Sequence, residues 1–218
     1  MVAGTTTPIP SEIAGLPVPQ DGVSTAAWSW AARHLPVYLL THSVRSYCWG
    51  AALARREDWT FDRQVLWTAA LLHDVGLTRI ASNTMCFEVE GAEIARPLLE
   101  GFGMDADAAD RAAIAIILHM QPNVTLSDGV EAVLLDRATG LDVRGVGFDL
   151  VDAETRDAVV AAFPRADFDQ RFETAIQREV ARRSDCQSAR LLGSRPGGPS
   201  VLAAGMAASP WATRRVGG

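Results

Sequence analysis

The sequence contains no lysine, and all 20 of its basic residues are arginines. This absence excludes a P-loop lysine, a Schiff-base lysine and a lysine-assisted phosphate site. No apolar run approaches the ~18 residues that a membrane span needs, and the polar, proline-rich residues 1–21 do not resemble a secretory signal. The formal net charge of -6 argues against binding nucleic acid by phosphate neutralisation. We therefore expect no nucleic acid and no membrane among the partners, and a cytoplasmic protein.

Cysteine is also scarce. The three cysteines, Cys48, Cys86 and Cys186, are odd in number, lie far apart in the chain and form no C-x-x-C pair. This usage is typical of a reducing compartment. It predicts neither a disulfide framework nor a thiolate zinc site.

The rest of the composition is that of an ordinary folded domain, with 48% hydrophobic and 21% charged residues in a chain of 218. That length supplies one sizeable core. Apolar residues recur at three- and four-residue steps, and no run of alternating strands is found. We predict one all-α bundle of seven or eight helices over residues 24–184, with flexible tails at 1–23 and 185–218. The predicted helices cover residues 25–34, 37–56, 61–74, 92–100, 105–120, 127–139, 152–162 and 168–183.

Glycine and proline mark the expected helix ends. Gly76 and Gly140 follow directly on apolar, helix-periodic segments and are predicted to stop them. Pro97 lies inside the apolar pattern of residues 92–100, so we expect it to kink or break that helix.

The most unusual stretch ends an apolar run with an adjacent His73 and Asp74. A buried histidine must be hydrogen-bonded, and a buried aspartate must be paired or must hold a cation, so a metal ion satisfies both. His42, on the preceding long helix, can supply a third donor. Asp142 and Asp136 are both candidates for a fourth donor from a later helix.

Each candidate also has a purely structural interpretation. His119 could be a ligand or a neighbour of the ligands, but a histidine on an apolar helix face is more often a satisfied core side chain. Asp142 lies between two glycines and could simply cap a turn. His34 is interpreted as a helix-end surface residue. Only the joint arrangement favours a metal site.

Three features together resemble the HD-domain superfamily of metal-dependent hydrolases: the single His42, an adjacent His-Asp pair about thirty positions later, and a distant aspartate. Within that superfamily, several short segments are similar to the cyanamide hydratase branch. The similarity extends over roughly residues 27–183. The segments are His42–Tyr47, Leu71–Thr78, Phe87–Ala92, Asp142–Gly145 and Phe163–Arg165.

The resemblance implies an HD-domain-like helical bundle that holds one divalent metal ion, zinc by analogy, with Fe2+ or Mn2+ as the other choices. It maps the ligands onto His42, His73, Asp74 and a terminal aspartate. We place that aspartate at Asp142, because the Asp-Val-x-Gly context matches, and keep Asp136 as the fallback. No additional histidine pair lies between Asp74 and Asp142, which disfavours the dinuclear phosphodiesterase type.

The resemblance also implies a reaction: a metal-bound hydroxide would attack the carbon of a small nitrile-type substrate, with cyanamide to urea as the lead case. We expect Asp74 to relay a proton, and His119 or Thr78 to donate a hydrogen bond to the nitrile nitrogen. Arg45 is expected to orient a ligand carboxylate or to hold Glu88. Glu88 is expected to support a metal-bound histidine.

Other functions stay open at this point. The main alternative is an HD-type phosphohydrolase acting on a nucleotide monophosphate or a related ester, which would have to bind phosphate with arginines alone. Further alternatives are a helical module that binds metal without chemistry, and hydration of a different nitrile or isonitrile. We expect a small-molecule substrate. Phe87 and Trp67 could line a small apolar pocket for it, but both are more often plain core side chains. The alanine-rich helices are compatible with a homo-oligomer.

Overall fold

Helices make up nearly all of the regular structure in the computed structural model, which describes residues 8–82, 84–193 and 201–213. The all-α class is confirmed. The described residues form eleven α-helices, more than the seven or eight expected, and one antiparallel pair of two-residue strands. The elements are β1 Glu12–Ile13, β2 Leu16–Pro17, α1 Gly22–His34, α2 Val37–Glu57, α3 Arg63–Leu72, η1 Val75–Leu77, α4 Phe87–Gly101, α5 Ala106–Leu118, η2 Leu126–Asp128, α6 Val130–Arg144, η3 Phe148–Leu150, α7 Ala153–Ala162, α8 Phe168–Arg182, α9 Gln187–Leu192, α10 Val201–Ala207 and α11 Pro210–Thr213.

Aspartate side chains begin several of these helices. At α1, α3, α5 and α7 the residue before the helix is an aspartate whose carboxylate accepts hydrogen bonds from backbone N–H groups of the first turn. Each carboxylate satisfies N–H groups that would otherwise lack a partner. These N-caps therefore explain where the helices start.

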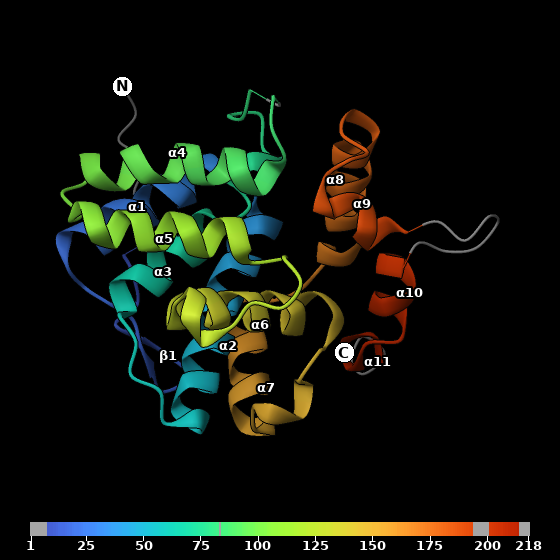
Figure 1. Ribbon diagram of the computed structural model, residues 1–218. Coiled ribbons are helices and arrows are strands. Elements are labelled where there is room, and N and C mark those ends of the chain that lie inside the picture. The colour runs from blue at the N-terminus through green and yellow to red at the C-terminus, as the bar shows by residue number, and fades with distance from the viewer. Residues whose placement is uncertain (1–7, 83, 194–200, 214–218) are drawn as a thin grey trace.

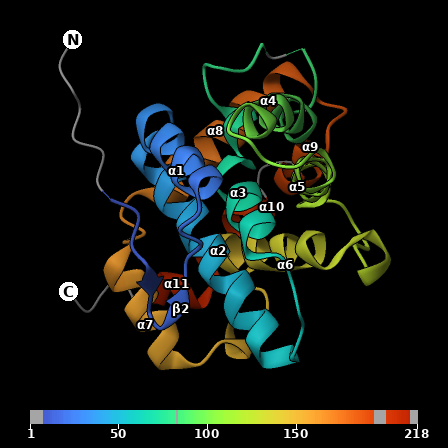
Figure 2. The same ribbon diagram turned by 90° about the vertical axis from the view of Figure 1, so that its left-hand side faces the viewer.

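The central helix is α3, which packs against α1, α2, α4, α5 and α6. All of its residues from Val65 to Leu72 are buried. Figure 1 shows α4 and α5 side by side on one side of the molecule, and α8, α9, α10 and α11 together on the other. In Figure 2, α2 and α6 cross near the middle of the molecule. Helix α3 therefore ends inside the protein, and His73 and Asp74, which directly follow it, are buried.

A second apolar cluster joins the C-terminal helices to the rest. Its buried members come from α2, α4, α6, α8 and α10, and they are separate from the main core around α3. They are Leu39, Phe87, Val143, Phe168, Phe172, Ile176, Leu202 and Met206. This cluster seals one side of the region in which the histidines lie.

The prediction that Gly140 ends a helix is wrong. Helix α6 continues through Gly140 to Arg144 and ends at Gly145, whose φ of 71° is in the left-handed region that glycine adopts freely. A glycine inside a helix costs only about 1 kcal/mol, and the buried Leu141 and Val143 carry the apolar face past it. Asp142 is therefore on a helix and not in a turn.

Pro97 also does not break its helix, because α4 runs without interruption from Phe87 to Gly101. Proline removes the hydrogen bond to the carbonyl four residues earlier, here that of Glu93. Both Pro97 and Glu93 are exposed, so water can bind that carbonyl.

The N-terminal tail predicted at residues 1–23 is wrong for the part that the structure describes. Ile13 and Leu16, in the strand pair, are buried. The hydroxyl of Tyr47 donates to the carbonyl of Pro17 at 2.5 Å. Apolar residues between the prolines thus dock this segment on α2, whereas residues 1–7 lie outside the described residues.

The C-terminal tail predicted at residues 185–218 is likewise wrong where it is described. Leu202 and Trp211 are buried, and the indole of Trp211 donates to the carbonyl of Leu141 at 2.8 Å. Its ring stacks on Trp49, with the ring centroids 5.6 Å apart. A few apolar anchors therefore order a segment whose composition is typical of a flexible tail. Residues 194–200 and 214–218 lie outside the description.

The expectation that the cysteines are unpaired also fails. Cys86, before α4, forms a disulfide with Cys186, before α9, across 100 positions of the chain. Cys48 is free and buried. Sequence spacing hides the pair because only the fold brings these two helix starts together. In the described part of the chain, no helix has both the length and the apolar character that crossing a membrane requires.

Candidate metal centre

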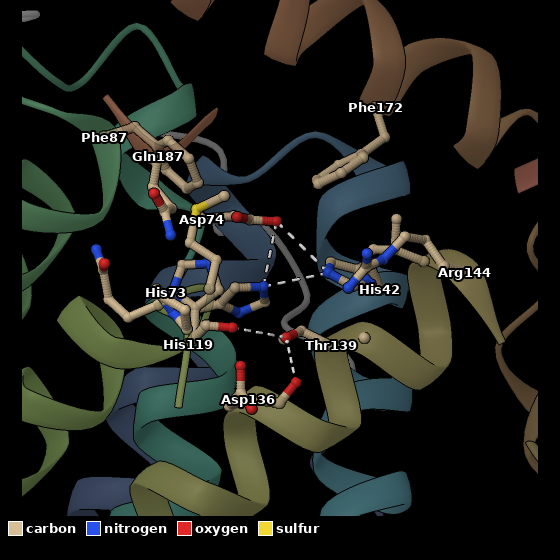
Figure 3. Close-up of a pocket in the computed structure, with 15 residues that line it drawn as sticks. His42, His73, Asp74, Phe87, His119, Asp136, Thr139, Arg144, Phe172 and Gln187 are labelled. Atoms are coloured by element: carbon tan, nitrogen blue, oxygen red, sulfur yellow. Dashed lines mark hydrogen bonds and ion pairs between the residues drawn. The ribbon is translucent and has the colours of Figure 1, made fainter. Parts of the chain in front are cut away.

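Three predicted ligands meet inside the protein. The Nε2 atoms of His42 and His73 are 3.2 Å apart, and Oδ2 of Asp74 lies 3.6 Å from the first and 3.2 Å from the second. All three side chains are buried. Figure 3 shows them pointing toward one another from α2 and from the end of α3. The residues predicted from the adjacent His-Asp pair and the earlier histidine are thus brought together.

Hydrogen bonds on the far side of each imidazole ring fix its orientation. Nδ1 of His42 contacts the carboxylate of Asp142 at 2.7 Å, and Nδ1 of His73 contacts the carbonyl of Ala70 at 2.8 Å. Nδ1 of His119 contacts the carbonyl of Ile116 at 2.6 Å. Carbonyl and ionised carboxylate oxygens only accept, so each Nδ1 must donate. The lone pair of each neutral ring is therefore on Nε2, as metal ligation requires.

His73 and His119 occupy equivalent places. Each directly follows the last residue of its helix, α3 or α5, and each donates to a carbonyl three residues earlier. Their rings meet edge to face with centroids 4.9 Å apart. Three residues after His73, Gly76 lies so close to the start of α4 that any Cβ would overlap the carbonyl of Phe87. A hydrogen bond to its own helix end thus orients each of these imidazoles.

Asp142 does not reach the cluster. Its Oδ1 accepts from Nε of Arg45 at 2.8 Å and from the indole of Trp49 at 2.8 Å. Its Oδ2 accepts from Nη2 of Arg45 and from Nδ1 of His42, each at 2.7 Å. The carboxylate lies behind the ring of His42, away from Nε2. Its prediction as a direct ligand is therefore not matched by the structure, which makes it the partner that orients His42.

The role expected for Arg45 is partly matched. It grips the carboxylate of Asp142 with two nitrogens, and its Nη1 donates to the carbonyls of Phe163 and Pro164, each at 3.2 Å. Arg45 is completely buried. Its expected contact with Glu88 is absent among the described hydrogen bonds and ion pairs of Arg45, because that guanidinium faces α6 and the segment after α7.

Sequence reasoning missed two members of this network. Trp49 lies seven residues after His42 and four after Arg45, a spacing that puts all three on one face of a helix and could have revealed it. Arg165 donates to the backbone carbonyl of Asp142 at 2.6 Å and lies 3.3 Å from its Oδ1. It ends the segment Phe163–Arg165 but received no role.

The pKa values follow from these contacts. Burial would raise the pKa of Asp142, but Arg45 and Arg165 outweigh it and hold that pKa well below the usual range. Burial would likewise raise the pKa of Asp74, but His73 beside it lowers the value to about 2. Burial and the proximity of His73 lower the pKa of His119 to about 4. At neutral pH both carboxylates are ionised and His119 is neutral.

A divalent cation fits the three donors. Both carboxylate oxygens of Asp74 are buried with no hydrogen-bond partner among the described residues, although an ionised buried carboxylate requires compensation. Nε2 of His42 and Nε2 of His73 also face each other at 3.2 Å. The donors of a tetrahedral zinc site lie about 3.3–3.4 Å apart, from bond lengths of 2.0–2.1 Å. The observed separations of 3.2, 3.2 and 3.6 Å match that spacing.

Two other predicted residues lie apart from the cluster. The hydroxyl of Thr78 donates to the carbonyl of Val75 at 2.7 Å and closes the turn of η1. Glu88 is buried, and burial raises its pKa, with the charge of Glu179 adding to the effect. Neither Thr78 nor Glu88 lines the cavity described next.

The three donors open onto a cavity of about 250 Å³. Phe87 lines it, although a plain core position was the more expected one, whereas Trp67 is a core residue whose ring stacks with Trp28. Asp136, the fallback ligand, is on the cavity wall but outside the three-donor cluster, and burial raises its pKa to about 6. The lining residues are His42, His73, Asp74, Phe87, His119, Met120, Gln121, Pro122, Asp136, Thr139, Gly140, Val143, Arg144, Phe172 and Gln187.

Comparison with known proteins agrees with this geometry. Residues 39–144 match the HD domain family. Two curated relatives from Saccharomyces cerevisiae, cyanamide hydratase DDI2 and cyanamide hydratase DDI3, are each 30% identical to this chain over 179 residues. The aligned part covers 80% of this chain and 80% of each relative. The matched HD region contains all three donors and Asp142.

Proposed function

Because this chain belongs to the HD-domain family, in its cyanamide hydratase-like branch, we propose that it adds water to a small nitrile-type substrate. Cyanamide, converted to urea, is the lead case. The observation that carries the proposal is the group of two imidazole nitrogens and one buried carboxylate without a hydrogen-bond partner, which opens onto a cavity. The chain is a metal-dependent enzyme of the HD type, and the nitrile substrate is the finer assignment that we propose.

His42, His73 and Asp74 would hold the metal ion, for which we propose zinc because two imidazoles and one carboxylate suit it. A zinc ion bound there supplies a water molecule acidified to a pKa of about 7. Asp142 keeps Nδ1 of His42 protonated, and the carbonyl of Ala70 does the same for His73. These contacts keep the donor atoms aimed at one point without rearrangement.

The cavity wall also carries groups that can handle the proton of the reaction. Negative charge develops on the nitrile nitrogen as the carbon is attacked, so a proton must reach it. The pKa of Asp136, raised to about 6 by burial, lets this carboxyl hold and release a proton near neutral pH. His119 stays neutral with its lone pair on Nε2, so it accepts a hydrogen bond rather than donating one. Asp136 therefore replaces His119 and Thr78 as the proposed proton donor.

Metal content and a substrate panel test the proposal. Purified protein is expected to carry close to one zinc ion per chain, and His73→Ala is expected to lose both metal and activity. His34→Ala is the matched control, because His34 is exposed and contacts only its own helix. The metal-loaded protein is then offered cyanamide, small nitriles, isonitriles and nucleotide monophosphates.

Each result decides between functions. Hydration of a nitrile, lost in His73→Ala and kept in His34→Ala, supports the proposal. Phosphate release from nucleotides without any turnover of cyanamide would support the phosphohydrolase instead. Activity in metal-free protein would contradict the assignment of these residues.

A further inference from the structure

The cavity is larger than a cyanamide molecule requires. Its volume of about 250 Å³ is room for roughly eight water molecules at ~30 Å³ each. Cyanamide has only one carbon and two nitrogens. The space beyond the three metal-binding residues is thus available to a larger substrate, and the groups that line it indicate the chemistry of that substrate.

Arg144 is the cationic side chain in the cavity lining. It lies in the last turn of α6, and its aliphatic stem packs on Gly205 of α10, where a Cβ would approach its Cδ to 3.4 Å. Figure 3 places Arg144 on the side of the cavity where His42 lies, across from His73 and His119. The fold therefore directs this side chain to a defined place in the cavity.

The guanidinium of Arg144 makes no hydrogen bond or ion pair with the described residues. The nearby Arg45 and Arg165 differ, because both are engaged with Asp142 and with backbone carbonyls or Asp169. Asp136 on the same wall feels the charge of Arg144 but forms no ion pair with it. An arginine that lines a cavity and has no partner in the protein is suited to bind an anionic group of a ligand.

We propose that Arg144 binds a carboxylate of the substrate, so that the site takes a short nitrile carrying a carboxylate at its other end. This inference rests on the proposed function. The nitrile lies at His42, His73 and Asp74, and the carboxylate lies against Arg144. The amide side chains of Gln121 and Gln187 line the same cavity and can complete the hydrogen bonding of such a substrate.

The charge balance of the cavity favours a carboxylate over a phosphate. A phosphate group carries up to two negative charges, and phosphate sites gather several cationic groups. Apart from Asp74 among the metal-binding residues, the lining holds one arginine and one further aspartate, Asp136, and no lysine exists in the chain. One guanidinium presents two parallel N–H groups to one planar carboxylate, which matches a single negative charge.

Binding of the hydration products tests the inference without turnover. Malonamate, the product expected from cyanoacetate, has a carboxylate where malonamide, the product from cyanoacetamide, has a neutral amide of the same size. Calorimetry on the metal-loaded protein is expected to give a Kd roughly tenfold or more lower for malonamate. In Arg144→Gln this preference is lost, and in Arg144→Lys part of it remains. Arg178→Gln, which removes an exposed arginine of α8 outside the cavity, keeps it.

Kinetics and melting temperatures complete the experiment. The ratio of kcat/KM for cyanoacetate to that for cyanoacetamide is expected to fall roughly tenfold in Arg144→Gln, while the melting temperature stays near that of Arg178→Gln. Equal Kd values for the two products, or a preference that persists in Arg144→Gln, would overturn the inference. Tighter binding of phosphonoacetamide than of malonamate would also overturn it, in favour of a phosphate group. Failure to hydrate any nitrile would instead count against the proposed function, because the product Kd values do not depend on turnover.

Discussion

The two sides of the metal centre hold their histidines in different ways. His73 and His119 each donate to a carbonyl three residues earlier in the chain. His42 instead depends on Asp142, which is 100 positions away and is itself held by Arg45, Trp49 and Arg165. The first kind of support forms together with its helix, whereas the second exists only when α2, α6 and the segment before α8 have docked. We expect mutations on the two sides to differ accordingly.

Asp142→Asn is expected to have the largest effect. It leaves the buried Arg45 without a counter-charge, which should lower the free energy of unfolding by about 3–5 kcal/mol. Metal affinity should also fall roughly 10–100-fold, because His42 loses its orienting partner. Denaturant melts and metal titration measure the two effects. Asp149→Asn, at an exposed position, is the control. Unchanged stability would show that the two sides do not differ.

The disulfide links the two sides of the metal centre. Cys86 directly precedes Phe87, whose ring contacts His119, and Cys186 directly precedes α9, which packs on α8 and α10. Replacing both cysteines by serine should lower the free energy of unfolding by about 2–5 kcal/mol, because the bond closes a long loop of the unfolded chain. A reductant should lower the melting temperature of the wild type. The double variant should not respond to it. Equal melting temperatures of the wild type with and without reductant would contradict the linkage.

Trp49→Phe tests one hydrogen bond of the network that supports His42. It removes the indole N–H from Oδ1 of Asp142 but keeps an aromatic ring against Trp211. The expected cost is about 1.5–3 kcal/mol, typical of a hydrogen bond to a charged group. Trp59→Phe is the matched control, because Trp59 packs at the partly exposed end of α2. If both variants lost equally little stability, the indole bond to Asp142 would be dispensable.

Thr78→Val tests the locally supported side and should have the smallest effect. Its hydroxyl bonds only within the turn after Asp74, so we expect a loss of about 0.5–1.5 kcal/mol in stability. Catalytic activity should stay within about twofold of the wild type, which is less than 0.5 kcal/mol in the barrier. A loss of activity far beyond the loss of stability would return Thr78 to the catalytic role predicted from the sequence.

The sequence predicted what depends on neighbouring residues. The apolar period gave the all-α class and most helix boundaries. The His73-Asp74 pair and His42 pointed to the cluster that the structure forms. Two predictions from local sequence were wrong, because glycine and proline both disfavour helix. Burial of the apolar face outweighs that propensity at Gly140, and solvation of the freed carbonyl outweighs it at Pro97.

Long-range contacts could not be read from the chain. The rotation of α6 against α2 decides whether Asp142 faces the metal-binding atoms or Nδ1 of His42. That rotation depends on the packing of two helices whose contacting residues are 100 positions apart. The same holds for Arg165, Trp211 and the Cys86–Cys186 bond. The sequence by itself therefore determined the helices and the donor atoms, because their periodicity and helix-end hydrogen bonds are local. Only the tertiary structure decided which carboxylate orients a histidine, which arginine faces the cavity and how the C-terminal helices close it, because those outcomes depend on how distant segments pack.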